Sequence, residues 1–278
     1  NTDDDTLLES TEDFQVQLTN STHLNIDVSN DTANGSIYDN ETATVTITAN
    51  DATATETPTD DGQFTVDLGK VNNTDSAITV TYSVAGSATA TDDYTPLTGT
   101  VDIAIGQSTA VIDVTGIVDD IIVDPNETVE VTLVSTNNGS VGVNVTPATV
   151  TITDNDTTTL SVSAPGDAVE GSNFVFTVDL SNPKSSDTDV TLTLNGDIDN
   201  LDYDTYEYDD GSGGGYISVP GSGIITIPAN TTSVNVRVHT IDDALLESSE
   251  TITLNAITAD TDVSNNGVSV DDSAEVTD

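Results

Sequence analysis

Acidic residues recur in this sequence with a spacing that suits metal binding. A double aspartate is followed, eight residues after its first member, by a glutamate at three places, which begin at Asp4, Asp119 and Asp242. Ca²⁺ takes about six to eight oxygen ligands from carboxylates and carbonyls, whereas Mg²⁺ prefers few carboxylates and several waters. The repeated carboxylates therefore favour calcium. The absence of cysteine, with only 2 histidines, argues against zinc.

Further acidic residues lie at three other recurrent places: the turn after the first strand, the loop after the third strand and the end of the last strand. Alternate loops of an antiparallel sandwich fall at alternate ends, so these places and the double-aspartate loop share one end. In the middle repeat the candidate ligands are Glu56, Asp92, Asp93, Asp119, Asp120, Asp124, Glu127, Asp154 and Asp156. In the third repeat they are Glu170, Asp202, Asp242, Asp243, Glu247, Glu250 and Asp278. The N-terminal segment, which lacks the first turn and the third-strand loop, offers only Asp4, Asp5, Glu9, Glu12 and Asp51.

A solvated acidic surface on a salt-adapted protein is the alternative interpretation of these residues. The chain has 49 Asp and Glu against 3 Lys and Arg, which gives a formal net charge of −46. Carboxylates gathered at one end would repel one another without a cation. A merely solvating surface would not put acids at four recurrent loop positions, so calcium binding is the favoured interpretation.

The residues between these acids have the pattern of β-strands. Runs such as 100–105, 128–133 and 149–153 alternate Thr or an acid with Val or Ile, which predicts one buried and one exposed face. No stretch has a helical period. We predict an all-β fold of tandem, immunoglobulin-like antiparallel sandwiches placed end to end. Strands in the middle repeat are expected near 52–56, 63–68, 77–85, 98–105, 109–118, 128–135 and 145–153.

Internal repetition predicts the domain organisation. Residues 64–68 match 176–180, and the closing stretch 46–51 matches 151–156. We expect one complete repeat over 52–156 and a second over 157–278, the latter with a Gly/Tyr-rich insertion near 204–223. Residues 1–51 are expected to be only the C-terminal half of a third repeat.

Composition excludes several classes of function. Three basic residues cannot neutralise a phosphate backbone, which excludes nucleic acids and anionic membranes as electrostatic partners. No apolar run approaches the ~18 residues of a membrane span. The sequence begins without Met or a signal peptide, so we expect a mature fragment or an excised window. Acid pairs are copied into every repeat, unlike a catalytic pair, and no serine elbow has a credible base, so no enzyme is expected.

The ordered set of motifs resembles the Calx-β domain, known from the regulatory loop of sodium–calcium exchangers and from large bacterial surface adhesins. The motifs are the first-strand Glu56 and Glu170, the run 88–94 ending in Asp92-Asp93-Tyr94, the 99–101 strand start, the 119–127 loop and the closing 151–156. The resemblance implies that calcium ligands fall on these motifs. Two departures stand out: Asp124 replaces the glutamate of the other copies, and a long insertion follows Asp202-Tyr203.

The insertion contains four of the seven tyrosines, which are Tyr203, Tyr206, Tyr208 and Tyr216. They could form a sugar-binding patch, because tyrosine rings stack on sugar faces. A loop folded back on its own sheet, with the tyrosines as local core, is the interpretation that we favour.

These observations predict a calcium-binding structural segment of a long bacterial cell-surface or secreted protein. Its role would be a calcium-stiffened stalk or filament in adhesion or surface motility, with an extracellular location. Its partners would be neighbouring repeats of the same chain, with lateral or head-to-tail copies as a further option. The alternatives are a calcium sensor that changes its inter-domain angle and a surface-layer or sheath subunit.

Overall fold

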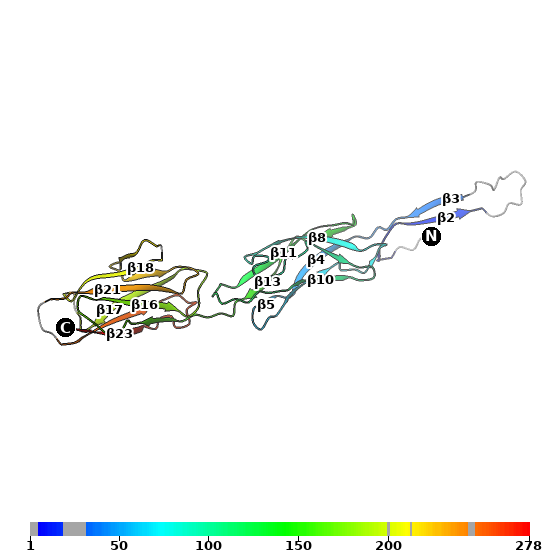
Figure 1. Cartoon of the computed structure of the whole chain (residues 1–278). Helices are drawn as coiled ribbons and strands as arrows, with labels where there is room; N and C mark the ends of the chain where they lie inside the picture. The colour runs from blue at the N-terminus through cyan, green and yellow to red at the C-terminus, as the bar shows by residue number, and fades with distance from the viewer. Residues whose placement is uncertain (1–4, 19–31, 199–200, 212, 244–247) are drawn as a thin grey trace, which may run out of the picture. The chain divides into compact units, whose positions relative to one another are not determined.

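The computed structural model describes residues 5–18, 32–198, 201–211, 213–243 and 248–278. All regular structure in these residues is β-strand, which confirms the predicted all-β fold. None of the described segments is a helix of the length and apolarity needed to cross a membrane. The strands belong to two compact units, one with β1 to β13 and one with β14 to β23 (Figure 1).

The first unit is a sandwich of two main sheets with strand orders β10-β6-β4-β12 and β5-β13-β11-β8-β9. Phe64 and Val66 on β6 and Val129 and Val131 on β11 are fully buried between the sheets. The strands are β1 (Leu8–Glu9), β2 (Glu12–Gln17), β3 (Thr32–Ile37), β4 (Ala43–Asp51), β5 (Thr53–Thr55), β6 (Gly62–Asp67), β7 (Asn72–Asn73), β8 (Ile78–Ala85), β9 (Thr100–Ile103), β10 (Thr109–Val114), β11 (Glu127–Thr136), β12 (Val141–Val143) and β13 (Ala148–Thr153). The seven strands predicted for the middle repeat correspond to β5, β6, β8, β9, β10, β11 and β13.

Strand β4 takes a place that the sequence pattern did not predict. We expected 43–51 to close the N-terminal half-repeat. Instead β4 pairs antiparallel with β6 and parallel with β12 inside the first unit. The cause is its alternation, because Val45 and Ile47 point into the same core as Phe64. Leu8 of β1 also joins this core, whereas every side chain of β2, in the β2–β3 hairpin, is exposed.

The second unit repeats the architecture with strand orders β14-β16-β21-β18-β19 and β15-β23-β22-β17-β20. Its own core contains Phe174, Phe176, Val236 and Leu254. The strands are β14 (Leu160–Ser163), β15 (Ala168–Val169), β16 (Asn173–Leu180), β17 (Thr188–Gly196), β18 (Tyr203–Asp209), β19 (Tyr216–Ser218), β20 (Ile224–Ile227), β21 (Ser233–Thr240), β22 (Glu250–Ile257) and β23 (Val270–Thr277). Each unit therefore buries a separate set of apolar side chains.

The tyrosine-rich insertion forms β18 and β19, which extend the sheet beyond β21. Tyr203, Tyr206 and Tyr208 pack against the core of the second unit. Burial raises the pKa of the Tyr206 hydroxyl, as expected for a ring packed inside the fold. The prediction of local core is confirmed for these three tyrosines, whereas the Tyr216 ring lies under the Arg237 guanidinium and is not among the residues packed against the core.

One of the three basic residues of the chain is buried. The ammonium of Lys184, with 2% of its side chain exposed, forms an ion pair with Asp260 and lies 3.4 Å from a carboxylate oxygen of Asp262. Burial alone would raise the pKa of Asp260. The hydrogen bond and charge of Lys184, with the hydrogen bonds from the Asp262 N–H and the Thr188 hydroxyl, together outweigh burial, so the pKa of Asp260 lies below its ordinary value. This pair ties the start of β17 to the loop after β22.

Two glycines hold equivalent positions at the ends of β8 and β17. Gly86 has φ +123° and Gly196 has φ +117°, which L side chains rarely adopt. A Cβ on Gly86 would lie 2.0 Å from the carbonyl oxygen of Thr128, and a Cβ on Gly196 would lie 2.0 Å from that of Thr251. The close approach lets β11 and β22, whose first residues are Glu127 and Glu250, begin against β8 and β17.

Candidate metal centre

Four acidic residues predicted as ligands of the third repeat line one small cavity in the second unit. Its volume is about 20 Å³, which is room for about one water-sized sphere. The lining residues are Glu170, Leu201, Asp202, Ile241, Asp243, Glu250 and Val276. Acidic residues from four separate segments therefore line a space of the size that a single ion would take.

Backbone contacts position three of these four acidic residues. Glu170 follows β15, and its N–H donates to the carbonyl of Thr277 at 3.0 Å, next to β23. Glu250 opens β22 and pairs with Val276. The N–H of Ile241 donates to the carbonyl of Asp202 at 2.8 Å, which joins the segment before β18 to the segment after β21.

Electrostatics at this cavity favour a cation. None of its lining residues is basic. The two basic residues of the second unit pair elsewhere: Lys184 with Asp260, and Arg237 with Glu207. Carboxylates that lie close together repel one another, and oxygen-only ligands suit a hard cation such as Ca²⁺. The donor set and the space fit calcium.

The remaining predicted residues of the third repeat are Asp242, Asp278 and Glu247. Asp242 lies against Gly171, the residue after Glu170, because a Cβ on Gly171 would lie 3.0 Å from the Asp242 Cβ. Asp278 follows β23 and is exposed. Asp4 of the N-terminal segment and Glu247 lie outside the described residues.

In the middle repeat, Glu56, Asp154 and Asp156 form a three-carboxylate group. Their carboxylate oxygens lie within 4.8 Å of one another, and each side chain is half-buried. Asp154 is fixed by two backbone donors: the N–H of Asp124 at 2.8 Å to Oδ2 and the N–H of Asp156 at 2.8 Å to Oδ1. This group can supply at least three of the oxygen ligands that calcium requires.

The other predicted residues of the middle repeat shape the loops around this group. The Asp93 carboxylate accepts the N–H of Thr89 at 2.6 Å, and the Asp93 carbonyl accepts the N–H of Val118 at 3.0 Å. The Asp120 carboxylate accepts the N–H of Ile122 at 2.6 Å. Asp124 contributes its backbone rather than its carboxylate to the bond with Asp154. Outside the three-carboxylate group lie Asp92, Asp93, Asp119, Asp120, Asp124 and Glu127.

The N-terminal segment has a looser arrangement of acids. The Asp5 carboxylate accepts the N–H of Leu7 at 2.8 Å. Desolvation and then the negative charges of Asp5, Glu12 and Asp39 raise the pKa of Glu9. The sequence reasoning missed Asp39, whose carboxylate accepts the Glu9 N–H at 3.1 Å. No repeated motif marks it.

Asp51 lies apart from those acids, on β4. It lines a shallow depression with Asp61 and Asp113. This placement follows from the pairing of β4 with β6, because Asp51 lies opposite Gln63 in that register. Glu12 opens the exposed β2, so the predicted ligands of this segment are spread over three elements.

Comparison with known proteins agrees with this architecture. The sequence model of the Calx-beta domain matches residues 1–51, 39–156 and 186–277, and the chain therefore belongs to the Calx-beta family. Residues 39–51, which include β4, fall in two of these matches. None of the curated proteins matches the chain.

Solved structures give distant similarities. A crystal structure of CBD12 from CALX1.2 has a TM-score of 0.34 and 14% identity, over 78% of this chain and 83% of that chain. The calcium binding domain CBD12 of CALX1.1 has a TM-score of 0.32 and 16% identity, over 78% of this chain and 82% of that chain. An activated Escherichia coli alpha-2-macroglobulin has a TM-score of 0.26 and 8% identity, over 96% of this chain and 24% of that chain.

Proposed function

We propose that this chain is a calcium-binding structural segment of a long bacterial cell-surface or secreted protein. The observation that carries the proposal is the cavity lined by Glu170, Asp202, Asp243 and Glu250 without a basic residue. These side chains would hold the ion in the third repeat, and Glu56, Asp154 and Asp156 would hold it in the middle repeat. The bound ion would supply charge neutralisation between carboxylates and no reaction chemistry.

The role that we propose is mechanical rather than catalytic. Tandem repeats give length at little cost in sequence complexity, and each unit has its own core. The connection between β13 and β14 is short and carries Asp154 and Asp156. Calcium held there would stiffen the link, as a stalk or filament in adhesion or surface motility requires. The partners would be neighbouring repeats of the same long chain, outside the cell.

Calcium titration of the full chain tests this function. We expect calorimetry to show saturable binding with a Kd of about 10⁻⁴–10⁻³ M, the range of extracellular modules. The double variant Glu170→Gln with Glu250→Gln should lose one class of sites. The matched control Asp271→Asn, an exposed acid on β23, should leave binding unchanged.

The same titration separates the structural role from a sensor role. A Kd of about 10⁻⁷–10⁻⁵ M would indicate a sensor. Small-angle scattering at fixed ionic strength then measures stiffening, which should appear on addition of millimolar calcium and disappear in chelator. An absence of calcium binding at millimolar concentration would overturn the proposed function.

A further inference from the structure

Strands β10 and β21 occupy the same position in the two units. In β10, Ile112 lies opposite Phe64 of β6, and in β21, Val236 lies opposite Phe176 of β16. The phenylalanines begin matching runs of sequence, so Asp113 of the first unit takes the place of Arg237 in the second.

The outer edges of β10 and β21 have different neighbours. On β21 the outer edge pairs antiparallel with β18, so that Tyr208 faces Val236 and Tyr206 faces Val238. By contrast, β10 is the last strand of its sheet. Val111 on β10 is 48% exposed. An edge strand without lysine or proline offers unpaired backbone groups to another strand.

The paths of the two repeats diverge after an Asp-Tyr pair that both repeats contain. The carbonyl of Asp93 accepts the N–H of Val118, which follows β10. In the same way, the carbonyl of Asp202 accepts the N–H of Ile241, which follows β21. After Tyr203 the chain continues as β18 along β21. After Tyr94 one further bond forms, from Thr95 N–H to Thr115 at 2.9 Å, and then Pro96, which has no N–H, leads the chain away to β9.

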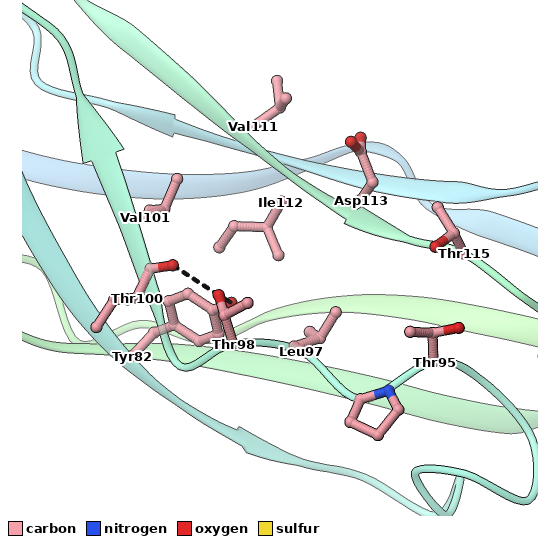
Figure 2. Close-up of a pocket in the computed structure, with 11 residues that line it drawn as sticks. Tyr82, Thr95, Leu97, Thr98, Thr100, Val101, Val111, Ile112, Asp113 and Thr115 are labelled. Atoms are coloured by element: carbon pink, nitrogen blue, oxygen red, sulfur yellow. Dashed lines mark hydrogen bonds between the residues drawn. The ribbon is translucent and has the colours of Figure 1, made fainter.

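This divergence leaves a groove between β9 and β10, with a volume of about 270 Å³. Figure 2 shows Val111 and Ile112 on one side of it and Thr95, Leu97 and Thr98 on the other. The volume is below the ~300–1,000 Å³ typical of small-molecule sites, which favours side chains of a strand as occupants. In the second unit, Tyr208 lies at the register that corresponds to Ile112 of this groove.

We propose that the groove beside β10 binds an extended peptide strand with aromatic side chains at alternate positions. The strand would pair antiparallel with β10 at Ile112–Val114, the positions that correspond to Val236–Val238 of β21, and the aromatic ring opposite Ile112 would enter the groove. The second unit already contains such an occupant as part of its own chain. The occupant of the first unit would come from a separate peptide or protein.

Charge at one register sets the specificity of this site. In the second unit Glu207 lies opposite Arg237 and forms an ion pair with it, and the guanidinium carbon of Arg237 lies 4.1 Å from the centroid of the Tyr216 ring. In the first unit Asp113 stands at the position of Arg237. The bound strand therefore carries a basic residue, not an acid, opposite Asp113.

Peptide binding to the isotope-labelled full chain tests the proposal by amide chemical shifts. The probe is the capped heptapeptide Tyr-Asn-Thr-Tyr-Lys-Tyr-Asn, and a second probe has Glu in place of Lys. We expect saturable shifts at Thr109–Val114 and a preference of about threefold for the Lys probe. A third probe with serine in place of each tyrosine should not bind.

Variants of Asp113 make the test reciprocal. Asp113→Arg reproduces the residue of the second unit and should reverse the preference, so that the Glu probe binds more tightly. Asp113→Asn retains an acceptor for the Gln63 amide, which donates to Asp113 at 2.6 Å, and should abolish the preference. Shifts confined to β18 and β21, or an unchanged preference in both variants, would overturn the proposal.

Discussion

Asp154 accepts the backbone N–H of Asp124 at 2.8 Å, which joins the closing strand of the middle repeat to its double-aspartate loop. The same carboxylate accepts the N–H of Asp156. Two backbone donors thus orient one side chain of the three-carboxylate group before any ion is considered. The loop that was expected to supply carboxylates supplies a backbone donor at this point.

Removing the carboxylates beside Asp154 should abolish the stabilisation of the protein by calcium. We expect Glu56→Gln with Asp156→Asn to lose stabilisation of about 2.7 kcal/mol at a calcium concentration of 100 Kd. In chelator the variant should be as stable as the wild type or more stable, because repulsion is relieved. Calorimetric melting in both conditions measures this, with Asp102→Asn as the control. Equal melting of variant and wild type in calcium would contradict the assignment.

The Lys184–Asp260 pair should make stability depend on pH. The folded pKa of Asp260 is depressed, so its contribution is present above the unfolded pKa of ~3.9 and is lost as pH falls through the folded value. We expect Asp260→Asn to cost about 3 kcal/mol at pH 6, because Lys184 stays buried without its main partner. Urea unfolding should show a smaller cost at pH 2. A cost independent of pH would show that packing, not charge, is responsible.

Separate cores should give separate unfolding transitions. Phe176→Ala removes a fully buried ring from the second unit and should cost about 3–5 kcal/mol there. The transition of the first unit should stay in place. Phe64→Ala should show the converse in differential scanning calorimetry. A single transition shifted equally by both variants would show that the two units unfold together.

Gly196→Ala should strain the backbone where β17 meets β22 and should shift Glu250, a proposed calcium ligand. The added Cβ meets the Thr251 carbonyl at a positive φ, so we expect a cost of about 2 kcal/mol or more. Because Thr251 follows Glu250, calcium affinity should also fall. Gly221→Ala, which has open space around its Cβ position, is the control. Unchanged stability in the Gly196 variant would show that β22 can shift without cost.

Alternation of side chains was sufficient to predict most strands, because burial of one face follows directly from a period of two. Residues such as Glu170 and Glu250 were predictable as neighbours, because the place of a loop in the strand order determines the end of the sandwich at which that loop lies. Asp39 was not predictable as a neighbour of Glu9, because their contact depends on the pairing of β2 with β3. The groove beside β10 was also hidden, since it results from where the chain turns after Pro96.

Strand β4 has a consequence for the whole class of tandem arrays. One family match takes residues 39–51 as the end of a repeat and another takes them as a beginning, while in this structure β4 lies between β6 and β12. A strand can lie in only one sheet at a time, so residues that match the end of one repeat serve here as a strand inside the next sandwich. The number of repeat motifs counted along the sequence can therefore exceed the number of closed sandwiches.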